Sequence, residues 1–550
     1  MIASIPSAVL VGVEGKHVSV EVHVSNGLPG FTVVGLPDAA VRESRDRVRA
    51  ALLSSGLSWP LRRVTVNLAP SGMRKGGAGL DLPIAVGVLV ASGALDPRTV
   101  DGTAFLGELG LDGSLRGVPG TVALAAALVD HRLVVPSESR WEAQLAGEVD
   151  VRTATTLGSL VECLTGRGRW HHSADLGDAD ESPSSGSSPS DRGGASGTSG
   201  TSGWSGWSGW SSEPGSGGER DDMFGGDSSP GPDLADVQGQ RLARRALEVA
   251  AAGGHHLLFV GPPGSGKTML ATRMPGLLPP LARSTALEVT RIHSVAGLSL
   301  PRTGLVERPP FRAPHHGASP VAMIGGGTSG MRPGEISLAH GGVLFLDEMG
   351  EFPSIVLDSL RQPLEEGVVR VSRARGSAVI PARFILVGAM NPCPCGDGGA
   401  PGQCRCSAAS RERYTRRLSA PLFDRFDITI RVGPPEAVRL AKPKPGETTS
   451  TVAERVARAR RRAVERGVGC NALLAASVLD DVAPLSEAAA DIVERRLRSG
   501  ALSARGLHRI RRLARTVADL DESGLLLGED HVREALLLRS PRQILLGAEV

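Results

Sequence analysis

Residues 255–270, HHLLFVGPPGSGKTML, form a glycine-rich segment of the kind that binds nucleotide phosphates. The segment fits the pattern G-x-x-x-x-G-K-[ST], in which backbone N–H groups and the start of a helix surround the phosphates. Lys267 would reach the β- and γ-phosphates, and Thr268 would bind Mg²⁺. The ATP-binding residues expected from this pattern are Gly261, Pro262, Pro263, Gly264, Ser265, Gly266, Lys267 and Thr268.

The use of lysine supports this interpretation. Nearly all the positive charge of the chain is arginine, and lysine occurs at positions 16, 75, 267, 442 and 444. Nucleotide bias of the genome explains the general preference for arginine. A lysine that persists at Lys267 is then informative, because a compact ammonium fits a phosphate nest in which a planar guanidinium would not.

A second stretch, GGVLFLDEMGEF at residues 341–352, predicts a buried apolar strand that ends in two acids. Asp347 would hold Mg²⁺, directly or through water, and Glu348 would act as the general base on the attacking water. Carboxylates at the carboxyl end of a strand lie where open α/β sheets bind their ligands. The pattern alone is weak, but its position after a phosphate-binding loop makes it specific.

Two further polar side chains follow predicted strands. The segment RFILVGAMN, residues 383–391, ends in Asn391, whose amide could orient the attacking water and contact the γ-phosphate. The segment 419–430, SAPLFDRFDITI, contains Arg425, which could reach the nucleotide of a neighbouring subunit and stabilise charge in the transition state. The alternative for Arg425 is an ion pair with Asp424 or Asp427 on the surface.

An arginine-rich helix is predicted near the end of the chain, in LSARGLHRIRRLARTVADL. Arg505 lies at the start of this helix, where its side chain suits a second contact to the γ-phosphate. Arg509 and Arg512 are rivals for the same role, since they lie on the same helix.

The stretch 389–406, AMNPCPCGDGGAPGQCRC, holds four of the six cysteines of the chain. Cys393, Cys395, Cys404 and Cys406 follow the pattern C-x-C-x₈-C-x-C, and four thiolates suit tetrahedral Zn²⁺. The spacing differs from the common C-x₂-C, so free thiols and a disulfide or redox role stay open. A zinc site here could brace the segment between Asn391 and Arg425.

Length and composition limit the class of protein. The 550 residues predict two to four domains, and a formal net charge of +3 excludes a strongly basic chain, so that any DNA-binding surface must be local. No run is apolar and long enough to cross a membrane, and the first residues do not resemble a signal peptide. With few cysteines, these features predict a cytoplasmic protein.

Pattern and composition divide the chain into four segments. Residues 1–170 predict a compact α/β domain, with a strand at 17–24, where polar and apolar residues alternate. Residues 171–231 are rich in glycine and serine and predict a disordered linker, which contains Trp204, Trp207 and Trp210. Residues 232–435 predict an α/β core, and residues 436–550 are nearly all helical by their periodicity.

Two segments of the core are candidates for contact with a polymer. EGVVRVSRARGSAVIPARF predicts a hairpin with Arg370, Arg373 and Arg375 near its tip, which could bind DNA phosphates; ordinary surface arginines are the alternative. PHHGASPVAMIGGG could form a second loop that lines a pore. Its His315 and His316 could be metal ligands, but contacts within the loop are the simpler interpretation.

Taken together, these motifs resemble the ComM/YifB-type proteins, which are magnesium-chelatase-like AAA+ ATPases. The segments that carry the resemblance are DVQGQ, GPPGSGKT, FRAPHHGASPVAMIGGG, PGEISLAHGGVLFLDEMGEF, LRQPLEEGVVRVSRA, AMNPCPCG, PLFDRFD and SARGLHRIRRLARTVADL. The resemblance implies an ATPase core with a parallel sheet in residues 232–435 and an all-helical lid in residues 436–550. The same resemblance implies ATP and Mg²⁺ as cofactors, Asn391 and Arg505 as sensors of the γ-phosphate, and a homohexameric ring. It also implies a helicase that promotes branch migration on single-stranded or branched DNA.

Other functions remain open at this point. A chelatase-like or chaperone-like ATPase that acts on a protein partner is the main alternative, and a regulator that uses its nucleotide only as a switch is another. The N-terminal segments KGGAGLDLPIAVGVL and FLGELGLDGSLRGVPG are similar to the ribosomal-S5-like fold shared by Lon-type protease domains and RadA. The position of a Lon-type serine falls near Gly79, and no lysine lies between residues 76 and 266, so proteolysis is not expected. The partner of this domain is not predicted.

Overall fold

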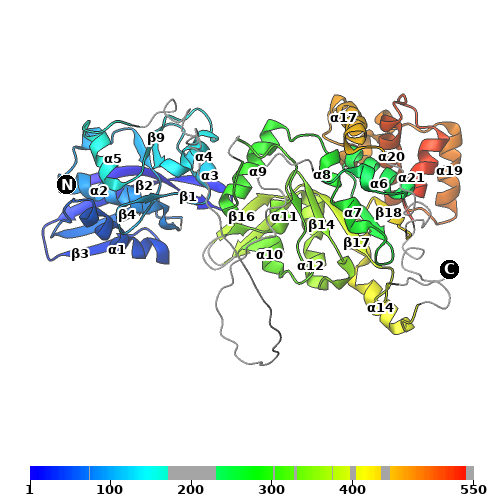
Figure 1. Cartoon of the computed structure of the whole chain (residues 1–550), viewed down its shortest axis with the longest axis horizontal. Coiled ribbons are helices and arrows are strands. Elements are labelled where there is room, and N and C mark those ends of the chain that lie inside the picture. Colours follow the sequence, from blue (N-terminus) through cyan, green and yellow to red (C-terminus); the bar gives the residue numbers. More distant parts are fainter. Residues whose placement is uncertain are drawn as a thin grey trace, which may run out of the picture.

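The computed structural model describes residues 1–73, 75–170, 231–301, 304–326, 331–373, 376–396, 404–434 and 446–540. The predicted linker therefore lies outside the described residues, apart from Gly231, and so does Arg375. Figure 1 shows two bodies side by side, with the N-terminal strands at one end and the C-terminal helices at the other.

The N-terminal body is an α/β domain with a four-stranded sheet, a three-stranded sheet and the two-stranded sheet β6-β7. Its larger sheet has the strand order β1-β2-β4-β3, and its parallel sheet has the order β5-β8-β9. Every residue of the apolar helix α2 is buried except the last, because the helix packs on β1 and β2. The elements are β1 (Ile2–Val11), β2 (Glu14–Ser25), β3 (Gly30–Val34), α1 (Ala39–Ser54), β4 (Arg63–Ala69), α2 (Asp81–Ser92), β5 (Thr103–Phe105), β6 (Glu108–Leu109), β7 (Leu115–Arg116), α3 (Thr121–Ala126), β8 (Arg132–Pro136), α4 (Arg140–Gln144), β9 (Val151–Ala154) and α5 (Leu157–Leu164).

The second body contains a five-stranded parallel sheet with the order β11-β14-β17-β10-β18. Strands β10, β14 and β17 are buried along their whole length, as their continuous apolar sequences predict. The elements are α6 (Arg241–Gly253), β10 (Leu257–Val260), α7 (Lys267–Ala271), α8 (Met274–Leu277), α9 (Arg283–Ala296), β11 (Phe311–Arg312), α10 (Pro320–Ile324), β12 (Gly325–Gly326), β13 (Arg332–Pro333), α11 (Glu335–Leu338), β14 (Val343–Leu346), α12 (Ser354–Ser359), α13 (Arg361–Glu366), β15 (Val368–Arg373), β16 (Gly376–Pro381), β17 (Ile385–Met390), α14 (Ala408–Arg417), α15 (Ala420–Phe423) and β18 (Ile428–Arg431).

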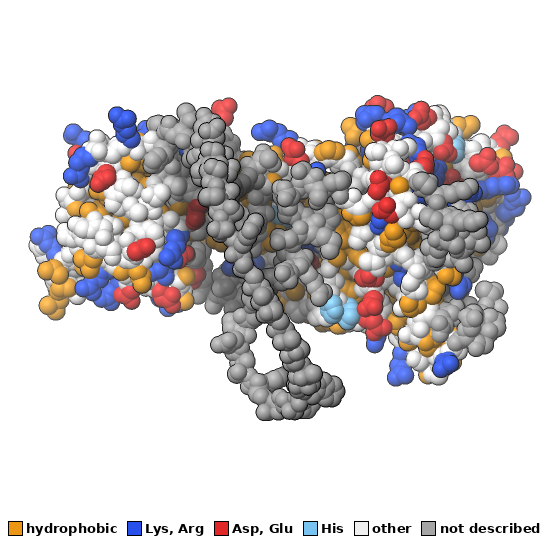
Figure 2. All heavy atoms as spheres, in the orientation of Figure 1, with side chains coloured by type: hydrophobic (Ala, Val, Ile, Leu, Met, Phe, Trp, Pro, Cys, Tyr) orange, Lys and Arg blue, Asp and Glu red, His pale blue; other side chains and the backbone are white. Residues whose placement is uncertain are grey.

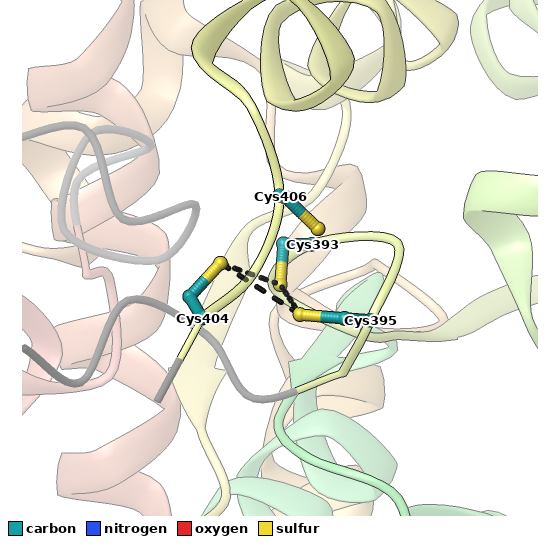
Figure 3. Close-up of side chains that lie close together, drawn as sticks. All are labelled: Cys393, Cys395, Cys404 and Cys406. Atoms are coloured by element: carbon teal, nitrogen blue, oxygen red, sulfur yellow. Dashed lines mark hydrogen bonds between the residues drawn. The ribbon is translucent and has the colours of Figure 1, made fainter. Parts of the chain in front are cut away.

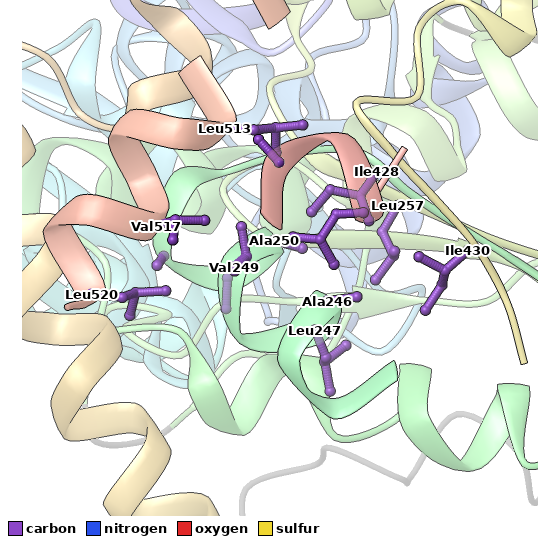
Figure 4. Close-up of a cluster of buried hydrophobic side chains, with 14 of the residues drawn as sticks. Ala246, Leu247, Val249, Ala250, Leu257, Ile428, Ile430, Leu513, Val517 and Leu520 are labelled. Atoms are coloured by element: carbon purple, nitrogen blue, oxygen red, sulfur yellow. The ribbon is translucent and has the colours of Figure 1, made fainter. Parts of the chain in front are cut away.

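The helical C-terminal region packs onto the back of this sheet. Its helices are α17 (Thr449–Glu465), α18 (Leu479–Val482), α19 (Glu487–Arg498), α20 (Ala504–Leu520) and α21 (Glu529–Leu537). In Figure 4, Leu513 and Val517 of α20 lie in one apolar cluster with Val249 of α6 and the strand residues Leu257 and Ile428. The lid and the sheet thus share a core. This mixed α/β fold with a parallel sheet and a helical C-terminal region confirms the predicted fold class.

The N-terminal domain also packs directly on the second body. The backbone N–H of Gly120 donates to the carbonyl of Ser294 at 2.9 Å, and the hydroxyl of Ser294 donates to Glu142 at 2.9 Å. Val13, at the turn between β1 and β2, joins the apolar cluster that contains Ala378 of β16. Figure 1 accordingly places β1 beside β16 and α3 beside α9. The hairpin β15–β16 is therefore supported from the N-terminal side.

The surface agrees with the nearly balanced charge. On the face shown in Figure 2, basic and acidic side chains are interspersed over both ends of the molecule. No helix among the described residues is long and apolar enough to cross a membrane.

Candidate nucleotide and magnesium site

The glycine-rich loop joins β10 to α7 and has the backbone shape that its sequence predicts. Gly264 and Gly266 adopt φ values of +73° and +87°, which favour glycine. A Cβ on Gly261 would lie 2.1 Å from the carbonyl oxygen of Val432, so no larger residue fits there. The hydroxyl of Ser265 is buried and has no hydrogen-bond partner among the described residues, as expected of a donor that awaits a ligand.

Lys267 is folded back over this loop. Its Nζ donates to the carbonyl oxygens of Gly261 at 2.8 Å and Pro262 at 2.9 Å, and to Oδ1 of Asn391 at 3.2 Å. Burial lowers the pKa of Lys267, while the nearby carboxylates of Asp347 and Glu348 raise it. The ammonium is thus held by neutral oxygens at the position where the phosphates of a nucleotide would replace them, so the site fits ATP.

Thr268 and Asp347 meet at the carboxyl edge of the sheet. The hydroxyl of Thr268 donates to Oδ2 of Asp347 at 2.6 Å. Oxygen ligands of this kind are those that Mg²⁺ prefers, and Mg²⁺ usually takes only one or two of them from the protein. The pair therefore fits Mg²⁺ beside a bound triphosphate. The parallel register of β14 and β17, with Leu346 opposite Gly388, brings Asn391 to the same edge.

Glu348 points toward a different partner. Its backbone has a φ of +49°, and its N–H donates to Oδ1 of Asp347 at 2.9 Å. Its Oε2 lies 3.2 Å from Nδ1 of His316. The prediction of contacts within the loop holds for His315, whose Nδ1 accepts from the N–H of Gly317 at 3.0 Å, but His316 faces the predicted general base.

The register of the sheet explains the contact that the sequence analysis missed. Arg312 of β11 lies opposite Leu344 of β14 in a parallel pair. His316 follows Arg312 by the same number of residues as Glu348 follows Leu344. Two chains that leave one sheet edge in the same direction can thus bring these side chains together. The contact could not be predicted from the sequence without knowing that β11 pairs with β14.

Arg425 makes neither of the two ion pairs considered as alternatives. Its guanidinium pairs with Glu365, while its Nε is buried without a partner among the described residues. Burial lowers the pKa of Arg425, and the neighbouring guanidiniums of Arg509, Arg505 and Arg361 lower it further. Arg425 thus lies between one carboxylate and three arginines, and the positive charge of these arginines favours an anionic ligand nearby.

The three arginines of α20 that are candidates for the second contact to the γ-phosphate lie in different environments. Arg505 is exposed in the first turn of the helix. Arg509 is buried, with its Nε 3.6 Å from Oδ1 of Asp427, and the Nε of Arg512 donates to the carbonyl of Leu474 at 2.8 Å. Arg505 is therefore the arginine of the three that is most available to a ligand, and it lies near Arg425.

The four clustered cysteines converge on one point (Figure 3). Their Sγ atoms all lie within 4.8 Å of one another. Cys393 is 3.2 Å from Cys395 and 3.7 Å from Cys404, and Cys395 is 3.7 Å from Cys404. Ligands of tetrahedral zinc at a Zn–S distance of about 2.3 Å are separated by about 3.8 Å. All four cysteines are free thiols rather than disulfides, so the donor set fits zinc.

The cysteine cluster is continuous with the nucleotide site. Cys406 directly precedes Ser407, which caps the N-terminus of α14. From α14, the hydroxyl of Tyr414 donates to the backbone carbonyl of Asn391 at 3.1 Å, and Arg417 donates to the carbonyl of Gly350 at 2.7 Å. Helix α14 thus contacts Asn391 itself and Gly350, which follows the acidic pair Asp347 and Glu348.

Arg370 and Arg373 lie at different positions along the hairpin β15–β16. Arg370 is opposite Val379, away from the tip, and its Nε donates to Glu366 at 3.1 Å. This corrects the expectation that Arg370 lies near the tip. Arg373 belongs to the last pair of the hairpin that the structure describes, opposite Gly376.

Comparison with known proteins identifies the family. The magnesium chelatase subunit ChlI family matches residues 233–440, a second ChlI domain family matches residues 20–139, and the ChlI C-terminal family matches residues 446–539. The chain is 42% identical to an uncharacterized protein of Mycobacterium tuberculosis over 535 residues, or 96% of each chain. It is 39% identical to competence protein ComM of Haemophilus influenzae over 547 residues, covering 99% of this chain and 98% of that one. It is also 38% identical to uncharacterized protein YifB of Escherichia coli over 538 residues, with 97% and 96% covered.

Proposed function

The chain belongs to the ComM/YifB-type, magnesium-chelatase-like family of AAA+ ATPases, and we propose that it is a ring motor that hydrolyses ATP to translocate on DNA and promote branch migration. The observation that carries the ATPase part is the meeting of Lys267, Thr268, Asp347 and Asn391 at one sheet edge. Proteins of this family use a nucleotide and Mg²⁺.

Each site residue has a role in this proposal. The loop from Gly261 to Thr268 binds the phosphates, and Thr268 and Asp347 hold Mg²⁺, which neutralises charge on the phosphates. Glu348 takes a proton from the attacking water, and Asn391 orients that water. Lys267, held by neutral oxygens, turns from them to the phosphates when ATP binds.

Two arginines, Arg425 and Arg505, support the proposal of a ring. Arg425 acts on the nucleotide of the next subunit, since it lies in a cluster of arginines that an anion would stabilise. Arg505 lies near Arg425, so we propose that both contact the nucleotide at the same subunit boundary. A homohexamer is the assembly that the family resemblance favours.

DNA is the proposed polymer because of the hairpin β15–β16, which carries Arg370 and Arg373 in its described part. In a ring, repeated hairpins would place positive charge around the pore, and Arg375 would add to it. Contacts of this kind bind DNA phosphates regardless of base sequence. A relative named competence protein supports a role in recombination or transformation in the cytoplasm. The alternative is a chelatase-like or chaperone-like motor that acts on a protein.

A structural zinc ion is proposed at Cys393, Cys395, Cys404 and Cys406. The distances between the sulfurs match those of a tetrahedral site, and a reducing cytoplasm keeps thiols available for metal. By closing the loop before α14, zinc would hold Tyr414 against the carbonyl of Asn391.

The test is ATP hydrolysis by the purified full chain, alone and with single-stranded, duplex and forked DNA, with Glu348→Gln as the blank. Stimulation by forked or single-stranded DNA that is lost at high salt supports a motor on DNA. Hydrolysis that is indifferent to every DNA would instead favour a protein substrate. Strand exchange on a four-way junction then tests branch migration itself.

A further inference from the structure

Asp427 follows Arg425 by two residues and directly precedes β18. Its side chain is 14% exposed and contacts two different parts of the molecule. Oδ2 lies 3.3 Å from Nδ1 of His255, the second residue before β10, and Oδ1 lies 3.6 Å from Nε of Arg509 on α20. One carboxylate therefore joins the ATPase core to the lid, beside the arginine that is proposed to act on the next subunit.

His255 extends this link to a second residue of α20. Its ring is fully buried, and its Nε2 lies 2.8 Å from Oγ1 of Thr516, which is also buried and donates its hydroxyl proton to the carbonyl of Arg512. An Asp-His-Thr chain has the order of a nucleophilic triad, but a hydroxyl without access to solvent cannot attack a substrate. The chain instead fixes α20 against the core at Arg509 and Thr516, about two helical turns apart.

The end of the lid holds the same segment through its backbone. The guanidinium of Arg539, which follows α21, donates to the carbonyls of Phe426 at 2.6 Å and Asp427 at 3.1 Å. From the core side, the carbonyl of His256 accepts from the N–H of Asp427 at 3.0 Å. The place of this segment thus depends on both the lid and the core, and Arg425 immediately precedes it.

The carboxylate of Asp427 is held in its ionised form. Burial acts to raise its pKa, but the hydrogen bond with His255 and the charge of Arg509 outweigh burial and bring the pKa well below its usual value. Arg425 pairs with Glu365 instead of Asp427. Asp427 therefore acts on Arg425 through the position of the backbone rather than through direct contact.

Helix α20 carries Arg505 one turn before Arg509. Residues four apart lie on the same face of a helix, so the contact of Arg509 with Asp427 also sets the place of Arg505. The guanidiniums of Arg505 and Arg509 are both close enough to lower the pKa of Arg425. Two arginines from distant segments of the chain are thus placed relative to each other by one carboxylate.

We propose that Asp427 is a positioning residue that fixes Arg425 and helix α20 relative to each other, so that Arg425 and Arg505 reach the nucleotide of the next subunit together. A shift of the lid would then move Arg425 as well, because both are joined to the same side chain. The inference rests on the proposed action of Arg425 across a subunit boundary, and it adds the residue that couples the two arginines.

ATP hydrolysis by the full chain with Asp427→Asn is the first test. The substitution keeps the shape of the side chain and removes its charge. We expect kcat to fall by about 10²-fold, the cost of misplacing a reacting group by about 1 Å. The KM for ATP and the binding of a fluorescent nucleotide should stay unchanged, since the phosphate-binding loop is intact. Asp424→Asn, at an exposed position of the same segment, is the control and should keep the wild-type kcat. An unchanged kcat in Asp427→Asn, or equal losses in both variants, would overturn the proposal.

Arg509→Met tests the other end of the link. It should lower kcat with unchanged KM, and the double variant with Asp427→Asn should be no slower than the slower single variant, because either substitution already breaks the link. Losses that multiply would mean that the two residues act separately, and would overturn the proposal. Arg509→Met leaves Asp427 with His255, so its kcat and KM decide the matter if Asp427→Asn is too unstable to bind nucleotide.

Mixed rings separate this inference from the proposed function. Asp427→Asn subunits are mixed with an excess of Glu348→Gln subunits, which cannot hydrolyse ATP but keep Arg425 and Asp427. Turnover per Asp427→Asn subunit should rise toward the wild-type value, because its intact site now receives correctly placed arginines from the neighbour. Local misfolding of Asp427→Asn would not be rescued in this way.

Arg425→Ala mixed with Glu348→Gln in the same proportion is the reference. A gain with Arg425→Ala but none with Asp427→Asn would overturn this inference and leave the ring proposal standing. No gain with either variant would mean that the arginines do not act across a boundary, and then the ring proposal fails together with the inference.

Discussion

Lys267 and Asn391 lie 124 residues apart in sequence, yet Nζ of the first donates to Oδ1 of the second at 3.2 Å. The contact joins the phosphate-binding loop to the end of the neighbouring strand, because β10 and β17 are adjacent and parallel, with Val260 opposite Met390. One side chain would hold the phosphates, and the other would report whether they are present.

Substitution of Lys267 should affect ATP binding, whereas substitution of Asn391 should affect the rate of hydrolysis. Lys267→Ala should abolish ATP binding, measured with a fluorescent nucleotide, since Lys267 is the lysine of the phosphate-binding loop itself. Asn391→Ala should retain binding but lower kcat by about 10²-fold, as for other donors that act on charge in the transition state. Loss of binding in both variants would mean that Asn391 supports the loop rather than the reaction.

Removal of zinc should loosen the loop that holds α14. Cys404→Ser and Cys406→Ser should each lower the zinc content measured by mass spectrometry, lower the Tm and reduce kcat, because α14 carries the contact of Tyr414 to Asn391. Cys163→Ser, outside the cluster, is the matched control and should keep its zinc. Protein that contains no zinc, with a Tm insensitive to chelators, would contradict the proposed site.

Because the lid and the sheet share one core, truncation of Leu513 should lower the stability of the fold. Leu513 belongs to α20, and its side chain is fully buried in the apolar cluster that α20 shares with α6 and the strands (Figure 4). Leu513→Ala should lower the free energy of unfolding by about 2–5 kcal/mol, from lost burial and the cavity left behind. Denaturant titration measures this. Leu526→Ala, at an exposed position of the same region, should change it little.

Asp81 should make the stability of the N-terminal domain depend on pH. Burial raises the pKa of Asp81 from 3.8 to about 6, although hydrogen bonds from Arg47 oppose the rise. The folded state therefore binds more protons than the unfolded state between these values, and stability falls as pH rises from 3.8 toward about 6.

The measurement is the Tm of the full chain over this pH range, compared with Asp81→Asn. The variant cannot ionise at this position, so its Tm should lack this component of the fall. Parallel curves for the two proteins would show that Asp81 does not titrate there.

Substitution of the two hairpin arginines should weaken DNA binding to different extents. Arg373→Ala, in the last described pair of the hairpin, should weaken binding to single-stranded DNA and reduce the salt dependence of the binding constant. Arg370→Ala should have the smaller effect, because Arg370 is already paired with Glu366. Arg458→Ala on α17 is the control, since Arg458 pairs with Glu522 in the lid. Equal affinities for all three variants would remove the hairpin from the DNA interface.

Local patterns predicted the elements that bear the chemistry. The alternation of residues 17–24 predicted part of β2, and the apolar runs before the glycine loop, before Asp347 and before Asn391 predicted β10, β14 and β17. These patterns succeed because side-chain burial repeats with the period of the backbone. The order of these strands in the sheet could not be predicted in the same way, since it depends on pairing between distant segments.

The sequence by itself determined the family, the phosphate-binding loop and the set of acids, amide and thiols that surround it, because each depends on residue types at short spacing. Only the tertiary structure decided what these groups face. It pairs His316 with Glu348, turns Arg425 to Glu365 and places the turn at Val13 against the hairpin β15–β16. The reason is physical: such contacts follow from strand register and domain packing, which are set by the whole core rather than by neighbours in the chain.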